Sequence, residues 1–163
     1  MGFIDRVKER AKQKKMTIVL PETNDRRTVI AAHKVLEEDI ANIILIGNKQ
    51  EIMKTAEGLN LSKAKFVNPQ QCEKLDEYAE LLAMLRKGKG MTFEEAKELL
   101  LTNPLFMGCI MVKAGDADGM VAGAIHSSAN VLRAALQTLK TAPNIKLVSA
   151  FFVMVVPDCD MGE

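Results

Sequence analysis

A short stretch near residue 127 combines side chains that can bind an anion. Ser127 and Ser128 follow an apolar run, 120–125, and open a helical pattern that carries Arg133 in its second turn. Serine at a helix start accepts a hydrogen bond from a free backbone N–H, and such N–H groups attract phosphate. Because helical side chains lean toward the N-terminus, Arg133 can reach the same spot. The pattern predicts a phosphate site, although spacing alone favours an ordinary capped helix with a surface arginine.

Polar residues also follow the first predicted strand, 17–20. In an open parallel sheet, ligands gather at the carboxyl ends of the strands. We therefore expect the residues that follow the strands to share one cleft, namely Glu22, Asp25, Arg26, Ser127, Ser128 and Arg133. Glu22 and Asp25 are expected to organise a helix start. His126 is either a hydrogen-bonding turn residue or an acid-base group, and with no carboxylate nearby in sequence the first role is favoured. His33 lies on an apolar helix face and is interpreted as a packing residue.

These residues must be positioned by alternating strands and helices. Apolar runs predict strands at 17–20, 43–46, 64–67, 120–125 and 146–156, while 3.6-residue periodicity predicts helices at 3–11, 29–36, 51–57, 75–86, 92–101, 105–113 and 127–141. Such alternation predicts a three-layer αβα sandwich with a mostly parallel sheet. We expect an N-terminal α/β domain over 1–143 and the start of a second, truncated α/β domain over 144–163.

Composition narrows the function classes. The chain has 163 residues, of which 48% are hydrophobic and 26% charged, and its formal net charge is +1. These values are ordinary for a globular protein and argue against nucleic acid or a membrane surface as partners. Three widely spaced cysteines, Cys72, Cys109 and Cys159, suggest a reducing, cytoplasmic location. The longest apolar run, 147–156, is too short for a membrane span.

Several motifs resemble one enzyme family. The stretch from Asp118-Gly119 through Gly123-Ala124 and His126-Ser127-Ser128 to Leu132-Arg133 is similar to the signature of phosphate acetyltransferases, also called phosphotransacetylases. Further similar motifs, in the expected order, are Leu20-Pro21-Glu22 with Asp25-Arg26-Arg27, the run 43–48, the basic loop 85–90 and the run 149–159.

The resemblance implies reversible transfer of an acetyl group between coenzyme A and inorganic phosphate, giving acetyl phosphate in acetate metabolism. It implies that Arg86 and Arg133 hold the phosphates of coenzyme A, with Ser127 and Ser128 beside them. Coenzyme A or acetyl-CoA is then a substrate, and no metal or prosthetic group is expected. It also implies an isocitrate/isopropylmalate dehydrogenase-like fold and a homodimer at full length. Family members are about twice as long, so we expect a fragment that is inactive alone, with its catalytic residues beyond Glu163.

Two alternatives remain open at this point. One is a non-catalytic α/β module that binds a phosphorylated metabolite at Ser127. The other is a phosphate butyryltransferase, because the residues that choose the acyl chain are not identified. A dehydrogenase is disfavoured, since no Gly-x-Gly-x-x-Gly follows any predicted strand. Cys159 is not interpreted as a nucleophile, and Lys87 and Lys89 are interpreted as charges that neutralise a helix end.

Overall fold

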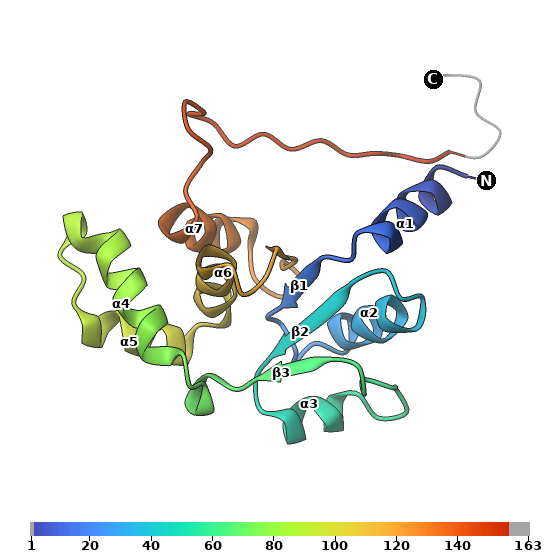
Figure 1. Ribbon diagram of the computed structural model, residues 1–163, viewed down its shortest axis with the longest axis horizontal. Helices are drawn as coiled ribbons and strands as arrows, with labels where there is room; N and C mark the ends of the chain where they lie inside the picture. Colours follow the sequence, from blue (N-terminus) through green and yellow to red (C-terminus); the bar gives the residue numbers. More distant parts are fainter. Residues whose placement is uncertain (1, 157–163) are drawn as a thin grey trace.

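Four parallel strands form the centre of the molecule, in the order β3-β2-β1-β4. The computed structural model describes residues 2–156. The strands are β1 (Thr17–Leu20), β2 (Asn42–Ile46), β3 (Lys65–Val67) and β4 (Gly119–Met120). The helices are α1 (Phe3–Gln13), α2 (Arg26–Glu37), α3 (Lys49–Thr55), α4 (Leu75–Arg86), α5 (Phe93–Thr102), α6 (Pro104–Ala114) and α7 (Ser128–Thr138), with short 3-10 turns at Pro69–Gln71 and Lys87–Lys89. Figure 1 shows their arrangement.

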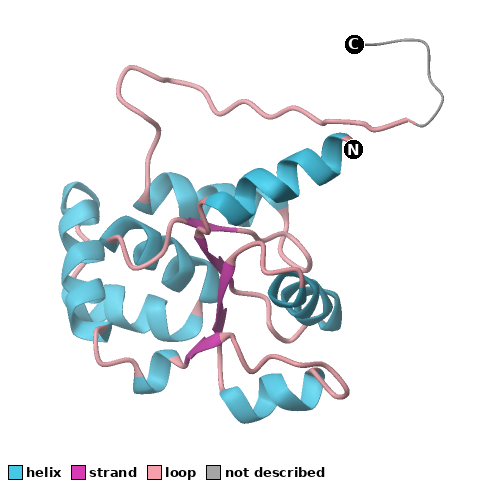
Figure 2. Cartoon of the chain, turned by 45° about the vertical axis from the view of Figure 1, so that its right-hand side comes forward, coloured by secondary structure: helices cyan, strands magenta, loops and turns pink. Residues whose placement is uncertain are grey.

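Helices cover both faces of the sheet, which confirms the three-layer α/β prediction for the described residues (Figure 2). On one face, Leu20, Ile43 and Leu45 pack against α2 and α3. On the other face, Val19 and Ile44 pack against α4, α5, α6 and α7. A parallel sheet buried on both faces needs strands that are apolar along their whole length, as the β2 sequence is.

Side-chain caps fix where most helices begin. Asp25, Asn48, Thr92, Asn103 and Ser127 each accept a hydrogen bond from a backbone N–H of the first turn. This satisfies donors that have no partner inside the helix. Thr92 and Glu95 form a reciprocal capping box at the start of α5, and α6 begins with Asn103 as its cap and Pro104 in its first turn.

Helix α6 runs through the interior, as its apolar sequence predicts. Gly108 lets it approach the sheet closely, because a Cβ at this position would lie 2.6 Å from Met120 Sδ and 3.3 Å from Val19 Cγ1. Helix α6 therefore packs directly against β1 and β4. The ends of these two strands carry the candidate site.

Two strand predictions are wrong. The run 120–125 does not form one buried strand, because β4 ends at Met120 and Val121 and Ile125 are exposed. Gly123 has φ +110°, far from the extended range of a regular strand and favoured only by glycine. The run 146–156 also forms no strand within the described residues, where it runs apart from the sheet (Figure 1). A strand requires a neighbour for its backbone N–H and C=O groups, and this segment has none there.

The segment 145–156 instead exposes its apolar side chains, with Phe151 87% and Phe152 95% accessible. Helix α1 likewise buries none of its residues. Across residues 2–156, no helix is both long enough and apolar enough to pass through a membrane.

Candidate functional site

The neighbouring strands β1 and β4 end side by side, and the connections that follow them lead to opposite faces of the sheet. Helix α2 follows β1 and buries Val29 on one face, whereas α7 follows β4 and buries Ala134 on the other. In open parallel sheets, a crevice at such a point is where ligands usually bind. Of the residues predicted to follow β1 and β4, Glu22 contacts the loop that leads into Ser127, whereas Arg26 points elsewhere.

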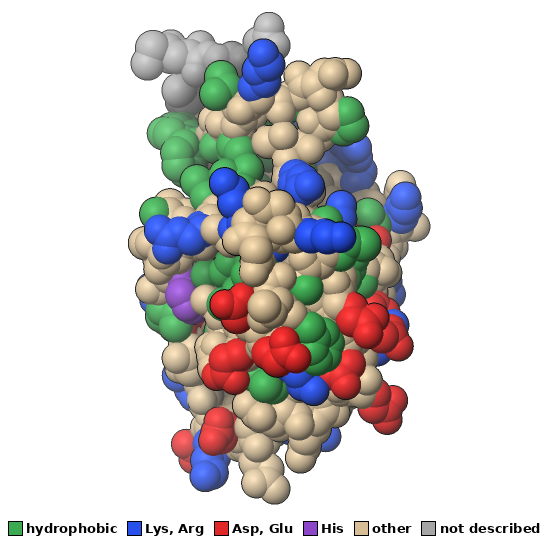
Figure 3. Space-filling view, turned by 90° about the vertical axis from the view of Figure 1, so that its left-hand side faces the viewer, with side chains coloured by type: hydrophobic (Ala, Val, Ile, Leu, Met, Phe, Trp, Pro, Cys, Tyr) green, Lys and Arg blue, Asp and Glu red, His purple; other side chains and the backbone are tan. Residues whose placement is uncertain are grey.

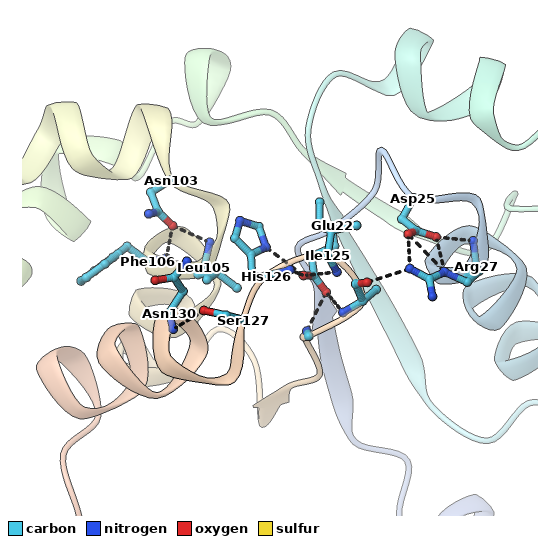
Figure 4. Close-up of polar contacts among 12 residues, drawn as sticks. Glu22, Asp25, Arg27, Asn103, Leu105, Phe106, Ile125, His126, Ser127 and Asn130 are labelled. Atoms are coloured by element: carbon cyan, nitrogen blue, oxygen red, sulfur yellow. Dashed lines mark hydrogen bonds and ion pairs between the residues drawn. The ribbon is translucent and has the colours of Figure 1, made fainter.

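The carboxylate of Glu22 lies at this point and is bound by the loop between β4 and α7 (Figure 4). One oxygen, Oε2, accepts hydrogen bonds from the backbone N–H groups of Gly123 and Ala124, both at 2.7 Å. The other, Oε1, accepts from the N–H groups of Ile125 at 3.0 Å and His126 at 2.8 Å. Four consecutive N–H groups thus surround one side chain that is only 2% exposed.

The same arrangement keeps Glu22 ionised. Burial on its own would raise the pKa of this carboxyl, but the hydrogen bonds from the backbone of His126, Ala124 and Ile125 and from the His126 ring outweigh burial and lower the pKa to about 2. A carboxylate that accepts several N–H bonds is stabilised in its charged form. Glu22 is therefore a fixed negative charge whose hydrogen-bonding capacity is already filled.

His126 contacts this carboxylate through its side chain too. Its Nδ1 lies 2.8 Å from Glu22 Oε1. No carboxylate lies near His126 in the sequence, and its carboxylate partner comes from 104 positions away; the favoured role as a hydrogen-bonding turn residue agrees with this contact. The expectation that Glu22 organises a helix start is wrong in part: its side chain binds the loop before α7, and only its backbone carbonyl receives the N–H of Asp25 near the start of α2.

Asp25 and Arg27 hold the loop from the side of α2. Asp25 caps α2 as predicted, by accepting the N–H of Arg27 at 2.8 Å. The Arg27 side chain forms an ion pair with Asp25 and donates to the carbonyl of Ala124, both at 2.7 Å. Its hydrogen bond with Asp25 lowers the pKa of that carboxyl.

Arg26 does not enter this cleft, contrary to prediction. Its guanidinium donates to the carbonyl of Thr55, the last residue of α3, at 2.8 Å and to that of Glu57 just past this helix at 3.2 Å. The residue that the sequence interpretation missed is Arg27. Both arginines lie in the first turn of α2, so adjacent side chains point in different directions around the helix. The sequence does not distinguish which of them faces the loop.

The N-terminus of α7 is open to solvent beside this loop. Ser127 caps the helix as predicted, with its Oγ accepting the N–H of Asn130 at 3.3 Å. Ser127, Ser128 and Arg133 are all exposed, and Arg133 Nη1 donates to Asn130 Oδ1 at 3.3 Å. The N–H groups of Ser128 and Ala129 belong to the first helical turn, which provides no backbone acceptor for them. Two hydroxyls, free amides and a guanidinium are therefore available at one helix end.

Arg86 lies at the end of α4, which packs against α7. Within residues 2–156 its Nε is buried without a hydrogen-bond partner, and no polar contact joins Arg86 to Ser127, Ser128 or Arg133. The lysines that follow are exposed, and the turn ends at Gly90 with φ +75°. The face of the molecule that carries α4 and α5 has Lys and Arg side chains gathered in its upper half and acidic side chains below (Figure 3).

Over residues 2–156, no three His, Cys, Asp or Glu side chains are grouped as metal ligands.

A cavity of about 590 Å³ lies farther along the same edge of the sheet, at the ends of β2 and β3, where Asn48, Lys49 and Gln71 line it. His33 Nδ1 is hydrogen bonded to the carbonyl of Asn60 at 3.1 Å, in agreement with a packing role. Cys159 lies outside the described residues.

Comparisons with known proteins agree with this architecture. Residues 2–162 match the family described as phosphate acetyl/butaryl transferase. Phosphate acetyltransferase of Thermoanaerobacterium thermosaccharolyticum is 51% identical over 163 residues, which are 100% of this chain and 49% of the relative. The chain thus spans about half the length of the curated relatives it matches.

Solved structures show the same fold. A phosphotransacetylase from Streptococcus pyogenes superposes with a TM-score of 0.84 at 36% identity, covering 90% of this chain and 46% of that protein. The EutD phosphotransacetylase from Staphylococcus aureus gives 0.86 at 35% identity, covering 95% and 47%.

Proposed function

Because the chain belongs to the phosphate acetyl/butaryl transferase family, we propose that it provides the phosphate-binding part of an enzyme site. The reaction is the reversible transfer of an acetyl group between coenzyme A and inorganic phosphate, which yields acetyl phosphate. The observation that carries this proposal is the exposed start of α7, where Ser127, Ser128 and Arg133 stand beside a rigidly held loop.

Arg133 is the proposed main contact to a phosphate of coenzyme A. Guanidinium is permanently charged and matches phosphate oxygens with a planar fork of donors. Its present partner is a neutral amide at 3.3 Å, so a phosphate can replace that contact at little cost. Ser127 and Ser128 add hydroxyl donors, and the positive end of the α7 dipole favours the same charge.

Arg86 is the proposed second contact. Coenzyme A carries several phosphate groups, so one arginine does not neutralise it. The unpaired buried Nε of Arg86 and the basic upper half of the α4–α5 face support a further anion contact there. Exposed Lys87 and Lys89 neutralise the end of α4 and are not assigned a role in binding.

The acyl transfer itself needs two groups beyond these ligands. A free cysteine thiol has a pKa of about 8.5, and the thiol of coenzyme A must likewise lose its proton before it attacks the acyl carbonyl. The oxyanion that forms then needs a donor or a cation. Ser127, Ser128 and Arg133 are donors rather than bases, and the nearby carboxylate, Glu22, is buried and fully bonded. We therefore propose that the base lies beyond Glu163, in the half of the relatives that this chain does not match.

The surrounding organisation follows the family resemblance. We propose an isocitrate/isopropylmalate dehydrogenase-like arrangement in which 1–143 is one domain and a second begins at 144. The order β3-β2-β1-β4, with its change of face beside β1, is compatible with such a doubly wound domain. We further propose a homodimer of the whole protein and a cytoplasmic location, which the free thiols of Cys72 and Cys109 support.

Calorimetric titration with coenzyme A tests the binding proposal. Arg133→Ala is expected to weaken binding about tenfold or more, the range of a lost charged hydrogen bond. Arg10→Ala, which removes an exposed arginine from α1, is the matched control and should leave affinity unchanged. Equal affinity in both variants would contradict the proposal. Tight binding of another phosphate compound without any response to coenzyme A would favour a non-catalytic metabolite-binding module instead.

Acyl transfer is tested by thioester formation from acetyl phosphate and coenzyme A. The chain is mixed with the C-terminal half of the Thermoanaerobacterium relative, and turnover is expected only when both are present. It should fall sharply with Arg133→Ala. Comparison with butyryl phosphate as the acyl donor distinguishes an acetyltransferase from a butyryltransferase.

A further inference from the structure

Glu22 connects two parts of the chain whose relative position decides the shape of the proposed site. Its carboxylate binds all four amides from Gly123 to His126. Among the described residues, the loop 122–126 makes no backbone–backbone hydrogen bonds, because the last bond from this segment to β1 is that of the Val121 N–H to the Val19 carbonyl, and Gly123 and Ile125 are exposed. Its conformation therefore depends on Glu22 and on the single bond from Arg27 to Ala124.

The last of these amides belongs to His126, which directly precedes the cap of α7. His126 is held twice, through its N–H and through its ring, both at 2.8 Å from Glu22 Oε1. At the other end of the loop, Gly123 has φ +110° and is the residue most able to change conformation. Without the carboxylate, a rotation at Gly123 would shift Ser127 relative to the sheet.

The four amides are not themselves free to bind a substrate. Four N–H groups converging on one point form a cradle typical of anion sites. Here each carboxylate oxygen already takes two of them, and the side chain is 2% exposed. A phosphate would have to displace a buried, fully bonded carboxylate, whereas the first turn of α7 lies open next to it.

We infer that Glu22 is a positioning residue: its buried carboxylate fixes residues 123–126 and thereby sets where the start of α7 presents Ser127, Ser128 and Arg133 to a phosphate. This inference rests on the proposed function of that helix end. Glu22 touches no substrate and acts only through the loop.

The contact also selects one form of the His126 ring. An ionised carboxylate only accepts hydrogen bonds, so the proton must lie on Nδ1, and Nε2 of the neutral ring is left without one. This preference is a spectroscopic signature of the contact between Glu22 and His126, and it is independent of any ligand. Nitrogen chemical shifts of the ring report it directly.

Glu22→Gln is the central variant, because an amide keeps the size of the side chain but loses the charge and replaces one acceptor by a donor facing N–H groups. Asp118→Asn is its matched control. Asp118 also joins β1 to β4 through a backbone amide, that of Thr17 at 2.7 Å, but at the opposite end of the strands. Both carboxylates bridge 101 positions, so the two variants differ chiefly in which end of the strand pair is loosened.

The first measurement is the dissociation constant for coenzyme A and for inorganic phosphate, with folding checked by circular dichroism. Glu22→Gln is expected to weaken binding about tenfold, whereas Asp118→Asn should stay within about twofold of the unchanged chain. The second is amide exchange together with the ring shifts of His126. Glu22→Gln should speed amide exchange in residues 123–126 and weaken the Nδ1 preference, while Asp118→Asn should change neither.

Unchanged affinity despite faster exchange in Glu22→Gln would overturn the inference, since the loop would then not matter for the ligand. Tighter phosphate binding would overturn it too, because the cradle itself would be the ligand site. If the unchanged chain binds neither compound, the proposed function fails, and exchange at 123–126 still decides whether Glu22 holds the loop. Should Glu22→Gln fail to fold, Glu22→Asp retains the charge but is too short to reach all four amides, and the same loss of affinity and protection is expected.

Discussion

Glu22 and Asp118 secure the same pair of strands from opposite ends. Asp118 accepts the N–H of Thr17 where β1 and β4 begin, and Glu22 accepts the amides after β4 where the two strands end. The strands share only two paired positions, Ile18 with Gly119 and Val19 with Met120. Side-chain carboxylates thus extend a very short ladder in both directions, and only the one at the carboxyl end lies at the proposed site.

The folding stability of the chain should fall in acid through Glu22. Its pKa is lowered from 4.5 to about 2 in the folded state, so its contribution is fully present above about pH 4.5 and is lost as pH falls toward 2. The shift corresponds to about 3 kcal/mol. Urea unfolding between pH 5 and 2 should show a smaller loss of stability in Glu22→Gln than in the unchanged chain. Parallel curves for the two proteins would contradict the assignment.

Gly108→Ala should destabilise the chain by about 1–3 kcal/mol, the usual cost of overpacking. The new methyl would meet Met120 Sδ at 2.6 Å and Val19 Cγ1 at 3.3 Å, so the Met120 side chain must move and Val19 must shift slightly. Gly88→Ala is the control, because nothing lies within 4 Å of a Cβ there. Thermal unfolding should give a lower midpoint for Gly108→Ala than for Gly88→Ala. Equal midpoints would show that the side chains beside Gly108 accommodate the methyl group.

Arg27→Ala should loosen the loop with little loss of global stability. The ion pair with Asp25 involves an arginine side chain that is 72% exposed, and such pairs contribute little. Loss of the bond to the Ala124 carbonyl should instead speed amide exchange in residues 124–127. Arg26→Ala is the neighbouring control and should loosen only the segment after α3, where its contacts lie. Faster exchange of the loop in Arg26→Ala would contradict this division of roles.

Cys109 should react with iodoacetamide far more slowly than Cys72. Burial raises the pKa of the Cys109 thiol to about 11, and its side chain is fully enclosed by α6 and its neighbours. Cys72 is partly exposed. Peptide mass spectrometry after brief alkylation at pH 8 distinguishes them, and Cys109 should become modified only after unfolding in urea. Equal modification of both under native conditions would mean that α6 opens readily.

The local features of the fold were predictable because they depend on nearby residues. Capped starts such as Thr92 and Ser127 pair a side chain with amides two or three positions on, and the amphipathic helices follow from periodicity alone. The parallel sheet follows from the alternation of strands and helices. The prediction of the site was less accurate where contacts join distant segments. Neither the contact of Glu22 with His126 nor the contact of Arg27, rather than Arg26, with the loop has a local signal in the sequence.

The two wrong strands have the same physical origin. A run such as 120–125 is apolar enough for a buried strand, but the amides from Gly123 onward bind a carboxylate instead of a neighbouring strand. The run 146–156 is apolar too, yet strand formation depends on a neighbour that apolar character does not provide. In these two runs the apolar sequence therefore predicts neither the strand pairing nor the burial that the structure shows.

The sequence separation between Glu22 and the amides of residues 123–126 has a kinetic consequence. These hydrogen bonds join residues 101 to 104 positions apart, so the entropy lost on closing the intervening chain must be offset before they can form. Helices and the neighbouring β1–β2 and β2–β3 pairs involve much shorter separations and can form earlier during folding. The start of α7 would then acquire its final position among the last events of folding, and a chain still emerging from the ribosome cannot bind its ligand there until both the loop 123–126 and Arg133 have been released.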